Sequence, residues 1–219
     1  YRQPAIYIKL PSKGKYYPAE VFTPTETGEI PVLPMTAKDE LAFKTPDAMI
    51  NGQATVDVIK SCVPGIRDPW SMPVIDLDTV LLGVRIASLG ESMDISVIVP
   101  KVEETIAYTV DLRVMMDQID RSQFNPYVVL GPTLTVKVKP MSYRQLTNLQ
   151  LRTYEQQRMI TQVAQGKMSA SEKNKEFNEI FNRMTNLTLD NMKEAVLEIN
   201  ADGDVITENT YISEFVDNM

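Results

Sequence analysis

The residues of this chain whose spacing comes nearest to a chemical site are acidic. Asn200, Asp202 and Asp204 stand at alternate positions, as the first ligands of a calcium-binding EF-hand loop do. That loop also requires glycine at its sixth position and glutamate at its twelfth, where Val205 and Tyr211 stand. An ordinary acidic turn is therefore the better interpretation.

Two further pairs of carboxylates could in principle serve as general acid and base. They are Asp76 with Asp78, and Glu103 with Glu104. Nothing in the sequence marks either pair as lining a cleft. Solvated charges and helix caps are therefore favoured over catalysis for both pairs.

Metal and thiol chemistry are limited by the same lack of ligands. The segment 99–102, Val-Pro-Lys-Val, has the outline of a Cys-Pro-x-Cys zinc knuckle with valine at both ligand positions. Cys62 is the only cysteine, so the chain has too few thiolates for a closed zinc site and none for an internal disulfide. Because Cys62 lies on an apolar helix face, we expect a buried structural thiol and not a nucleophile.

Composition excludes several classes of function. The chain of 219 residues has no histidine, which removes Ser-His-Asp and Cys-His arrangements and the usual ligand of zinc, copper and non-haem iron sites. Neither a P-loop nor a G-x-G-x-x-G motif is present, and we expect no cofactor. The formal net charge of -7 argues against nucleic acid as the main partner. No apolar run reaches the length of a membrane-spanning helix, the N-terminal sequence has no pattern of a secretory leader, and the single cysteine suggests a cytoplasm.

The first 90 residues predict an N-terminal strand and a helical core. Residues 5–10 are rich in branched and aromatic side chains, as strands are, and helix punctuation is dense in 36–90. Thr36 with Asp39 predicts one helix start, and Thr45-Pro46-Asp47 predicts another that Gly52 would end in the left-handed conformation. A helix is predicted over 53–62. The strongest helix of this half, apolar over much of its circumference, is expected to be central and to be capped by Asp76.

The middle of the chain predicts strands. Alternating residues at 93–98 and a strand-like run at 107–110 predict a hairpin, and 127–130 and 134–139 add two candidates. We expect these four strands to form one small antiparallel sheet. Leu112 to Ile119 permits a helical turn or two.

The C-terminal part predicts helices. Capping boxes at Ser142 and Ser169 each precede a helical apolar pattern, and Leu189, Met192, Val196 and Ile199 predict a third helix. Short loops favour an antiparallel bundle. We therefore predict an α+β fold with a mixed domain at 1–140 (helical core 36–90, β-rich part 93–139), a helical domain at 141–199 and an acidic tail at 200–219.

Residues suited to contact are more prominent than residues suited to chemistry. Trp70 lies between two prolines and could be a core plug or an exposed anchor for a partner, and Arg67 is close to it in sequence. The first 20 residues carry an excess of basic side chains, so this arm is either a solvated edge strand or a segment that pairs with a neighbouring subunit. The predicted partner contacts are Trp70, Arg67, Tyr7, Lys13, Lys15 and Tyr17.

The order of several segments resembles the baseplate proteins of contractile-tailed phages of the T4 type, in particular the hub-associated group. The segments are 5–17 (AIYIKLPSKGKYY), 34–40 (PMTAKDE), 44–52 (KTPDAMING), the Cys62-Val63-Pro64 break, and Asp76-Leu77-Asp78 leading into Arg85-Ile86-Ala87. The resemblance runs from about Tyr1 to Asp111 and is weaker over the C-terminal helices.

The resemblance implies a non-enzymatic structural or assembly subunit of the baseplate hub, made in the host cytoplasm and carried in the virion tail. Its partners would be other tail or baseplate proteins. A transient chaperone that guides the tape-measure protein into the growing tail is the alternative. The family supplies no catalytic residues. A carboxylate-based hydrolase is a third hypothesis, supported only by scattered Asp and Glu residues. The sequence does not predict an oligomeric state.

Overall fold

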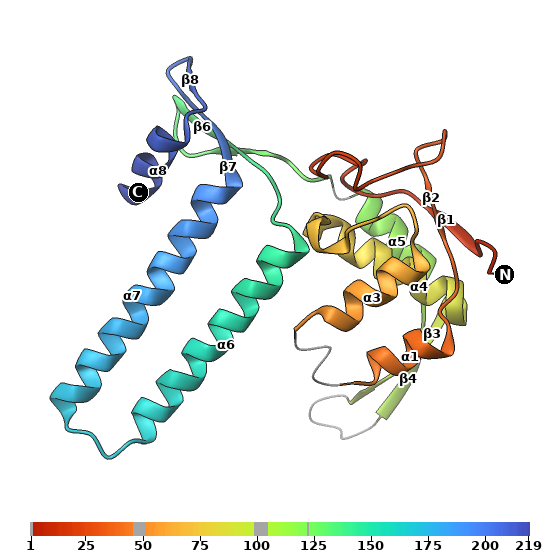
Figure 1. The fold of residues 1–219 in the computed structure, drawn as a ribbon, viewed down its shortest axis with the longest axis horizontal. Coiled ribbons are helices and arrows are strands. Elements are labelled where there is room, and N and C mark those ends of the chain that lie inside the picture. The colour runs from red at the N-terminus through yellow and green to blue at the C-terminus, as the bar shows by residue number, and fades with distance from the viewer. Residues whose placement is uncertain (1, 46–50, 99–104, 122) are drawn as a thin grey trace. The chain divides into compact units, whose positions relative to one another are not determined.

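The computed structural model describes the whole chain except residues 1, 46–50, 99–104 and 122 (Figure 1). By its internal contacts the chain divides into two units, residues 1–124 and 125–219. Helices and antiparallel strands follow one another in both units, which confirms the α+β class.

The first unit begins with two short strands and continues with helices and a hairpin. Its elements are β1 (Ile6–Ile8), β2 (Ile30–Val32), α1 (Ala37–Phe43), α3 (Gln53–Cys62), the 3-10 turns η1 (Pro69–Ser71) and η2 (Val74–Asp76), α4 (Leu77–Leu89), β3 (Ser92–Ile98), β4 (Thr105–Asp111) and α5 (Leu112–Arg121). Helices α3 and α4 and strand β1 therefore arise where the sequence predicts them, and α5 is longer than the expected turn or two.

The core of the first unit joins the N-terminal strands to the helices. β1 pairs antiparallel with β2, with Ile6 opposite Val32 and Ile8 opposite Ile30. These strands pack on α4 at Gly83, where an added Cβ would lie 3.2 Å from the Ile8 side chain. Strands β1 and β2 and helices α3 and α5 all contact α4, so the strongest predicted helix is indeed central.

The predicted helix starts have mixed outcomes. Thr36, Ser142 and Ser169 each form the expected capping box with the residue three positions on. Asp76 stands at the N-cap of α4, but its side chain makes no capping hydrogen bond. The expectation that Asp76 caps α4 was therefore wrong, because that carboxylate is buried and bonded elsewhere. The predicted start at 45–47 falls largely outside the described residues, and Gly52 has the expected positive φ of 75°, directly before α3.

The second unit is a four-stranded sheet with a long helical hairpin inserted in its sequence. Its elements are β5 (Tyr127–Val129), β6 (Leu134–Val138), α6 (Tyr143–Gln165), α7 (Ala170–Ala195), β7 (Val196–Ala201), β8 (Asp204–Ile206) and α8 (Asn209–Asp217). The strand order is β5-β6-β7-β8, all antiparallel. Figure 1 shows α6 and α7 running out from the sheet and back. Ile212 on α8 packs with Val136 and Ile199 in the core of this unit.

Two expectations for strands and helices were wrong. The four middle strands do not form one sheet: β3 pairs only with β4 among the described strands, and β5 and β6 join β7 and β8. The third helix is absent, because Leu189 and Met192 belong to α7 and the segment Val196–Ala201 pairs with β6. The segment expected as an acidic tail contains β8 and α8, whose apolar residues complete the core. The expected domain boundary at residue 140 consequently falls inside the second unit, between β6 and α6.

Candidate functional site

A buried carboxylate shapes the N-terminal loop that carries the predicted contact residues. Asp76 is fully buried, and its Oδ1 accepts the Ser12 N–H at 2.8 Å. Its Oδ2 accepts the Ser12 hydroxyl at 2.5 Å and the Tyr17 hydroxyl at 3.0 Å. Three donors bind both oxygens, so Asp76 acts as an anchor for residues 12–17. This position contradicts the expectation of a solvated charge.

The ionisation of this anchor is controlled by its burial. Burial raises the pKa of Asp76, although the hydrogen bonds from Ser12 and Tyr17 act in the opposite direction. Burial, together with the charge of Asp76 and the hydrogen bond to it, raises the pKa of Tyr17 far above its ordinary value. Tyr17 is therefore a neutral donor to Asp76 at any physiological pH, and it is not a general base.

The loop between the two anchor points is tightly turned. Lys13, Gly14 and Tyr16 all have positive φ, at 53°, 76° and 70°. Lys13 and Lys15 are exposed, and neither makes an ion pair with a described residue. Lys9 and Arg2, by contrast, lie 3.9 Å from Glu29 and 3.6 Å from Asp39. The loop therefore presents two available ammonium groups on a fixed backbone.

Phe22 connects this loop to the segment that carries Arg67. Its ring stacks on Tyr17 with a centroid distance of 4.9 Å, and it lies so close to Gly14 that an added Cβ would be 2.4 Å from the ring. Phe22 also forms an antiparallel bridge with Ile66, and the Arg67 N–H donates to the Val21 carbonyl at 2.8 Å. We call Lys13, Lys15, Tyr17, Phe22 and Arg67 the Phe22 surface.

Trp70 lies just beyond the Phe22 surface in the chain, on the η1 turn. The Asp68 side chain accepts hydrogen bonds from the main-chain N–H of Trp70 at 3.3 Å and from the Ser71 hydroxyl at 2.5 Å, and these bonds fix the turn. The indole is half-buried, so it is neither the fully enclosed plug nor the fully exposed anchor that the sequence left open.

Tyr7 is not part of the Phe22 surface. Its exposed ring lines a hollow of about 410 Å³ together with Lys9, Glu29 and residues of α5, among them Met116 and Asp120. The structure therefore joins the loop of Lys13 and Lys15 to Tyr17 and Arg67 through Phe22. It places Tyr7 at a hollow outside the Phe22 surface.

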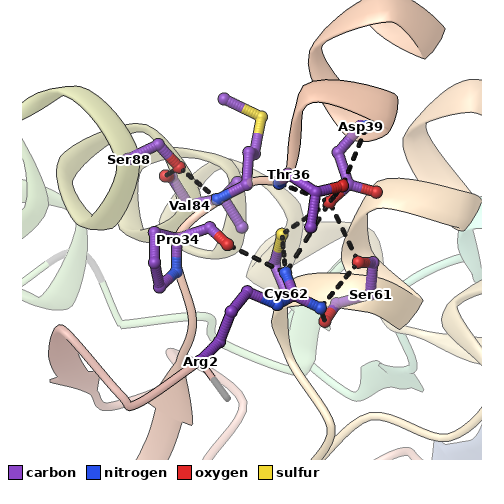
Figure 2. Close-up of polar contacts among 9 residues, drawn as sticks. Arg2, Pro34, Thr36, Asp39, Ser61, Cys62, Val84 and Ser88 are labelled. Carbon is purple, nitrogen blue, oxygen red and sulfur yellow. Dashed lines mark hydrogen bonds and ion pairs between the residues drawn. The ribbon is translucent and has the colours of Figure 1, made fainter.

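A polar network around Arg2 was not found from the sequence. The Arg2 guanidinium donates to the carbonyl oxygens of Pro34 and Ser61 at 2.8 and 2.9 Å, and Asp39 accepts the Ser61 hydroxyl at 3.0 Å (Figure 2). Burial favours a raised pKa for Asp39, but hydrogen bonds from Thr36 and Ser61 and the charge of Arg2 outweigh it and lower the pKa. The network ties the N-terminal arm to α1 and α3. Only the capping pair of Thr36 and Asp39 was visible as a sequence signal.

Cys62 lies inside this network as the expected buried thiol. Its Sγ is fully buried, and burial together with the charge of Asp39 raises its pKa. A thiol with a raised pKa is a poor nucleophile at neutral pH. Cys62 is therefore structural.

The acidic segment near residue 200 is a hairpin turn. The Asn200 side chain accepts the Gly203 N–H at 3.2 Å, and Asp202 has a φ of 52° in the tight connection between β7 and β8. No group of three Cys, Asp or Glu side chains among the described residues is placed to hold a metal ion. The segment 99–102 and the pair Glu103 and Glu104 fall within residues 99–104, which the structure does not describe. In the part of the chain that the structure describes, no helix is long and apolar enough to cross a membrane.

Comparison with known proteins places this arrangement in a family. No curated protein and no solved structure matches the chain. A family model described as T4 bacteriophage base plate protein matches residues 4–208, which include most of both units and therefore extend beyond the N-terminal half where the resemblance was strongest. The chain belongs to the T4 bacteriophage base plate protein family.

Proposed function

We propose that this chain is a non-enzymatic subunit of the baseplate hub that acts through contacts with other tail or baseplate proteins. The observation that carries the proposal is the family match over both units, which supports a structural subunit of a phage baseplate. The buried carboxylate and thiol agree with it, because Asp76 and Cys62 hold loops and helices in place and neither lines an open site.

The Phe22 surface is the proposed contact for such a partner. Lys13, Lys15 and Arg67 are exposed cations on a backbone that Asp76 and Phe22 hold in one conformation. A preordered loop loses little conformational entropy on binding. Carboxylates of an acidic partner segment are the matching chemistry, with Tyr17 and Trp70 as the aromatic part of the contact.

The protein composition of phage particles tests the assignment to the hub. Mass spectrometry of purified virions and of tail intermediates should detect the chain in both, and mild dissociation should release it with central baseplate components. Absence from mature virions, or release with peripheral components only, would contradict the hub role. A virion component would be made in the host cytoplasm and carried in the tail baseplate.

The chaperone for the tape-measure protein is a second candidate, favoured by the helical hairpin. Tyr154 on α6 and Phe181 on α7 are 64% and 69% exposed, and Met159 and Met168 add exposed methionines. Flexible methionine and aromatic side chains along a helical hairpin suit a surface that adapts to a partner helix. Co-purification with the tape-measure protein from infected cells, combined with absence from virions, would support this candidate over the structural one.

A further inference from the structure

Strand β5 forms one outer edge of the four-stranded sheet. Among the described strands, β5 pairs only with β6. The Leu130 N–H donates to Leu134 at 3.0 Å, and the Val138 N–H donates to Pro126 at 2.7 Å. Because hydrogen-bonded and non-hydrogen-bonded pairs alternate in an antiparallel ladder, Val128 faces β6 with its main-chain N–H and C=O, and Val129 points both groups away from the sheet.

Only some of the usual protections of a sheet edge are present at β5. Natural edges are protected by short length, prolines, charged side chains, bulges or a covering segment, and β5 has the first two, since it is three residues long and lies between Pro126 and Pro132. Residues 123–136 contain no charged residue, and the side chains of β5 and Leu130 are exposed, Val129 at 72%. The Asn125 side chain accepts the Tyr127 N–H at 3.0 Å, so the start of the strand is partly closed. The prolines at 126 and 132 then confine pairing to the residues between them.

An apolar hollow adjoins this edge. Val128 and Leu130 line it with Met192, Phe215, Val216 and Met219, and its volume is about 160 Å³. It exists because α8 packs on Val136 and Ile199, further into the sheet, and leaves the side chains next to β5 uncovered. The edge and the hollow form one continuous apolar area.

We propose that β5 is a self-association edge, at which two copies of this chain pair antiparallel across a two-fold axis through Val129. Charge directs a second copy to this edge and not to another surface. The chain has a net charge of -7, so two copies repel each other over most surfaces, but the stretch 123–136 is uncharged. Geometry favours it as well, because antiparallel pairing of one strand with itself is the isologous contact that two-fold symmetry produces.

The pairing uses groups that the structure leaves available. The Val129 N–H of each copy donates to the Val129 C=O of the other, and the bond from Tyr127 to Asn125 is kept. Val128 of one copy then lies opposite Leu130 of the other, on the face that carries the hollow. The result is an eight-stranded sheet whose two apolar hollows meet at the axis.

The experiment measures the dimer dissociation constant of the full chain by sedimentation equilibrium. Val129→Lys leaves the fold unchanged, because its side chain is exposed and its main-chain groups are not bonded to β6. It places two lysines opposite each other across the axis, with Cα atoms about 5.5 Å apart. We expect the wild type to dimerise and the variant to raise the dissociation constant at least about tenfold.

Val205→Lys is the matched control. Val205 is an exposed valine on β8, the other edge of the same sheet, so it receives the same new charge. Its dissociation constant should equal that of the wild type. Circular dichroism of each variant confirms that the sheet has formed.

Charge reversal tests the two-fold axis itself. Val129→Glu should dimerise as poorly as Val129→Lys, and an equimolar mixture of the two variants should form a heterodimer, because opposite charges then meet at the axis. A monomeric wild type at the highest concentration, an unchanged dimer in Val129→Lys, equal weakening in Val205→Lys, or no heterodimer in the mixture would each overturn the proposal. These measurements use the isolated chain and are independent of its role in the baseplate.

Discussion

Two of the described aspartates of the first unit are buried, and their environments move their pKa values in opposite directions. Burial raises the pKa of Asp76, which three uncharged donors bind. The pKa of Asp39 is lowered, because Thr36, Ser61 and the nearby Arg2 stabilise its charged form more than burial opposes it. The difference lies first in burial, which is complete for Asp76, and then in the hydrogen bonds to Asp39, to which the charge of Arg2 adds.

The first prediction concerns the pH dependence that Asp76 causes. A pKa raised in the folded state means that the folded chain binds more protons, so the contribution of Asp76 to the free energy of unfolding falls as pH rises above about 4. Asp76→Asn removes this contribution. The difference in unfolding free energy, variant minus wild type, should therefore increase from pH 4 to pH 7 in urea titrations. A difference that is constant or decreases would show that Asp76 does not titrate in this way.

The second prediction concerns the fit of Gly14 against Phe22. Gly14→Ala adds a methyl group that meets the Phe22 ring at 2.4 Å, at a positive φ that disfavours alanine. We expect a loss of about 2 kcal/mol or more in unfolding free energy. Gly28→Ala is the control, since φ is +79° there and nothing lies within 4 Å, so only about 1 kcal/mol should be lost. Equal losses in thermal or urea unfolding would mean that Phe22 does not fix the loop.

At the scale of elements, the helical hairpin and the sheet of the second unit depend on each other. α7 leads without a break into β7 at Val196, and β7 pairs with β6, which precedes α6. The hairpin therefore leaves and re-enters the sheet through adjacent strands. Each helix buries one side against the other and leaves large apolar residues exposed.

The third prediction compares two neighbours on α7. α7 contacts α6, and on α7 Ile180 is buried and Phe181 is exposed. Ile180→Ala should lower the unfolding free energy by about 3 kcal/mol, because it leaves a cavity in the helix contact. Phe181→Ala removes a larger side chain but should change the unfolding free energy by less than about 0.5 kcal/mol. If Phe181→Ala were the more destabilising variant in urea unfolding, the assigned faces of α7 would be wrong.

Across the whole molecule, the positions of the charged side chains bear more on partner binding than the net charge does. The net charge is -7, yet Lys13, Lys15 and Arg67 are exposed on two segments that Phe22 joins. An acidic protein with a local cationic surface can bind an acidic partner segment there and repel it elsewhere.

The fourth prediction tests this surface in the assembled particle. The double variant Lys13→Glu and Lys15→Glu reverses both charges of the loop and should reduce incorporation into tails at least about tenfold, through like-charge repulsion. Incorporation is measured by quantitative mass spectrometry of complemented phage. Lys167→Glu with Lys175→Glu makes the same charge change at two exposed lysines of the second unit and should leave incorporation unchanged. Equal loss in both variants would point to net charge and not to the loop.

The sequence by itself determined the local features of this protein. Helix starts at Thr36, Ser142 and Ser169, the central apolar helix α4, the buried Cys62, the α+β class and the phage baseplate family could all be predicted. Each depends on residues close together in the chain, or on a pattern along it.

Only the tertiary structure decided which distant segments meet. Leu134–Val138 pairs with Val196–Ala201, and Asp76 bonds to Ser12 instead of capping its own helix. The spacing of Val196 and Ile199 fits the helix that the sequence predicts, but this segment is a strand because it pairs with β6, which lies about 60 residues earlier. Strand pairing and the burial of a charge are non-local, because they depend on partners that the spacing of neighbouring residues does not reveal.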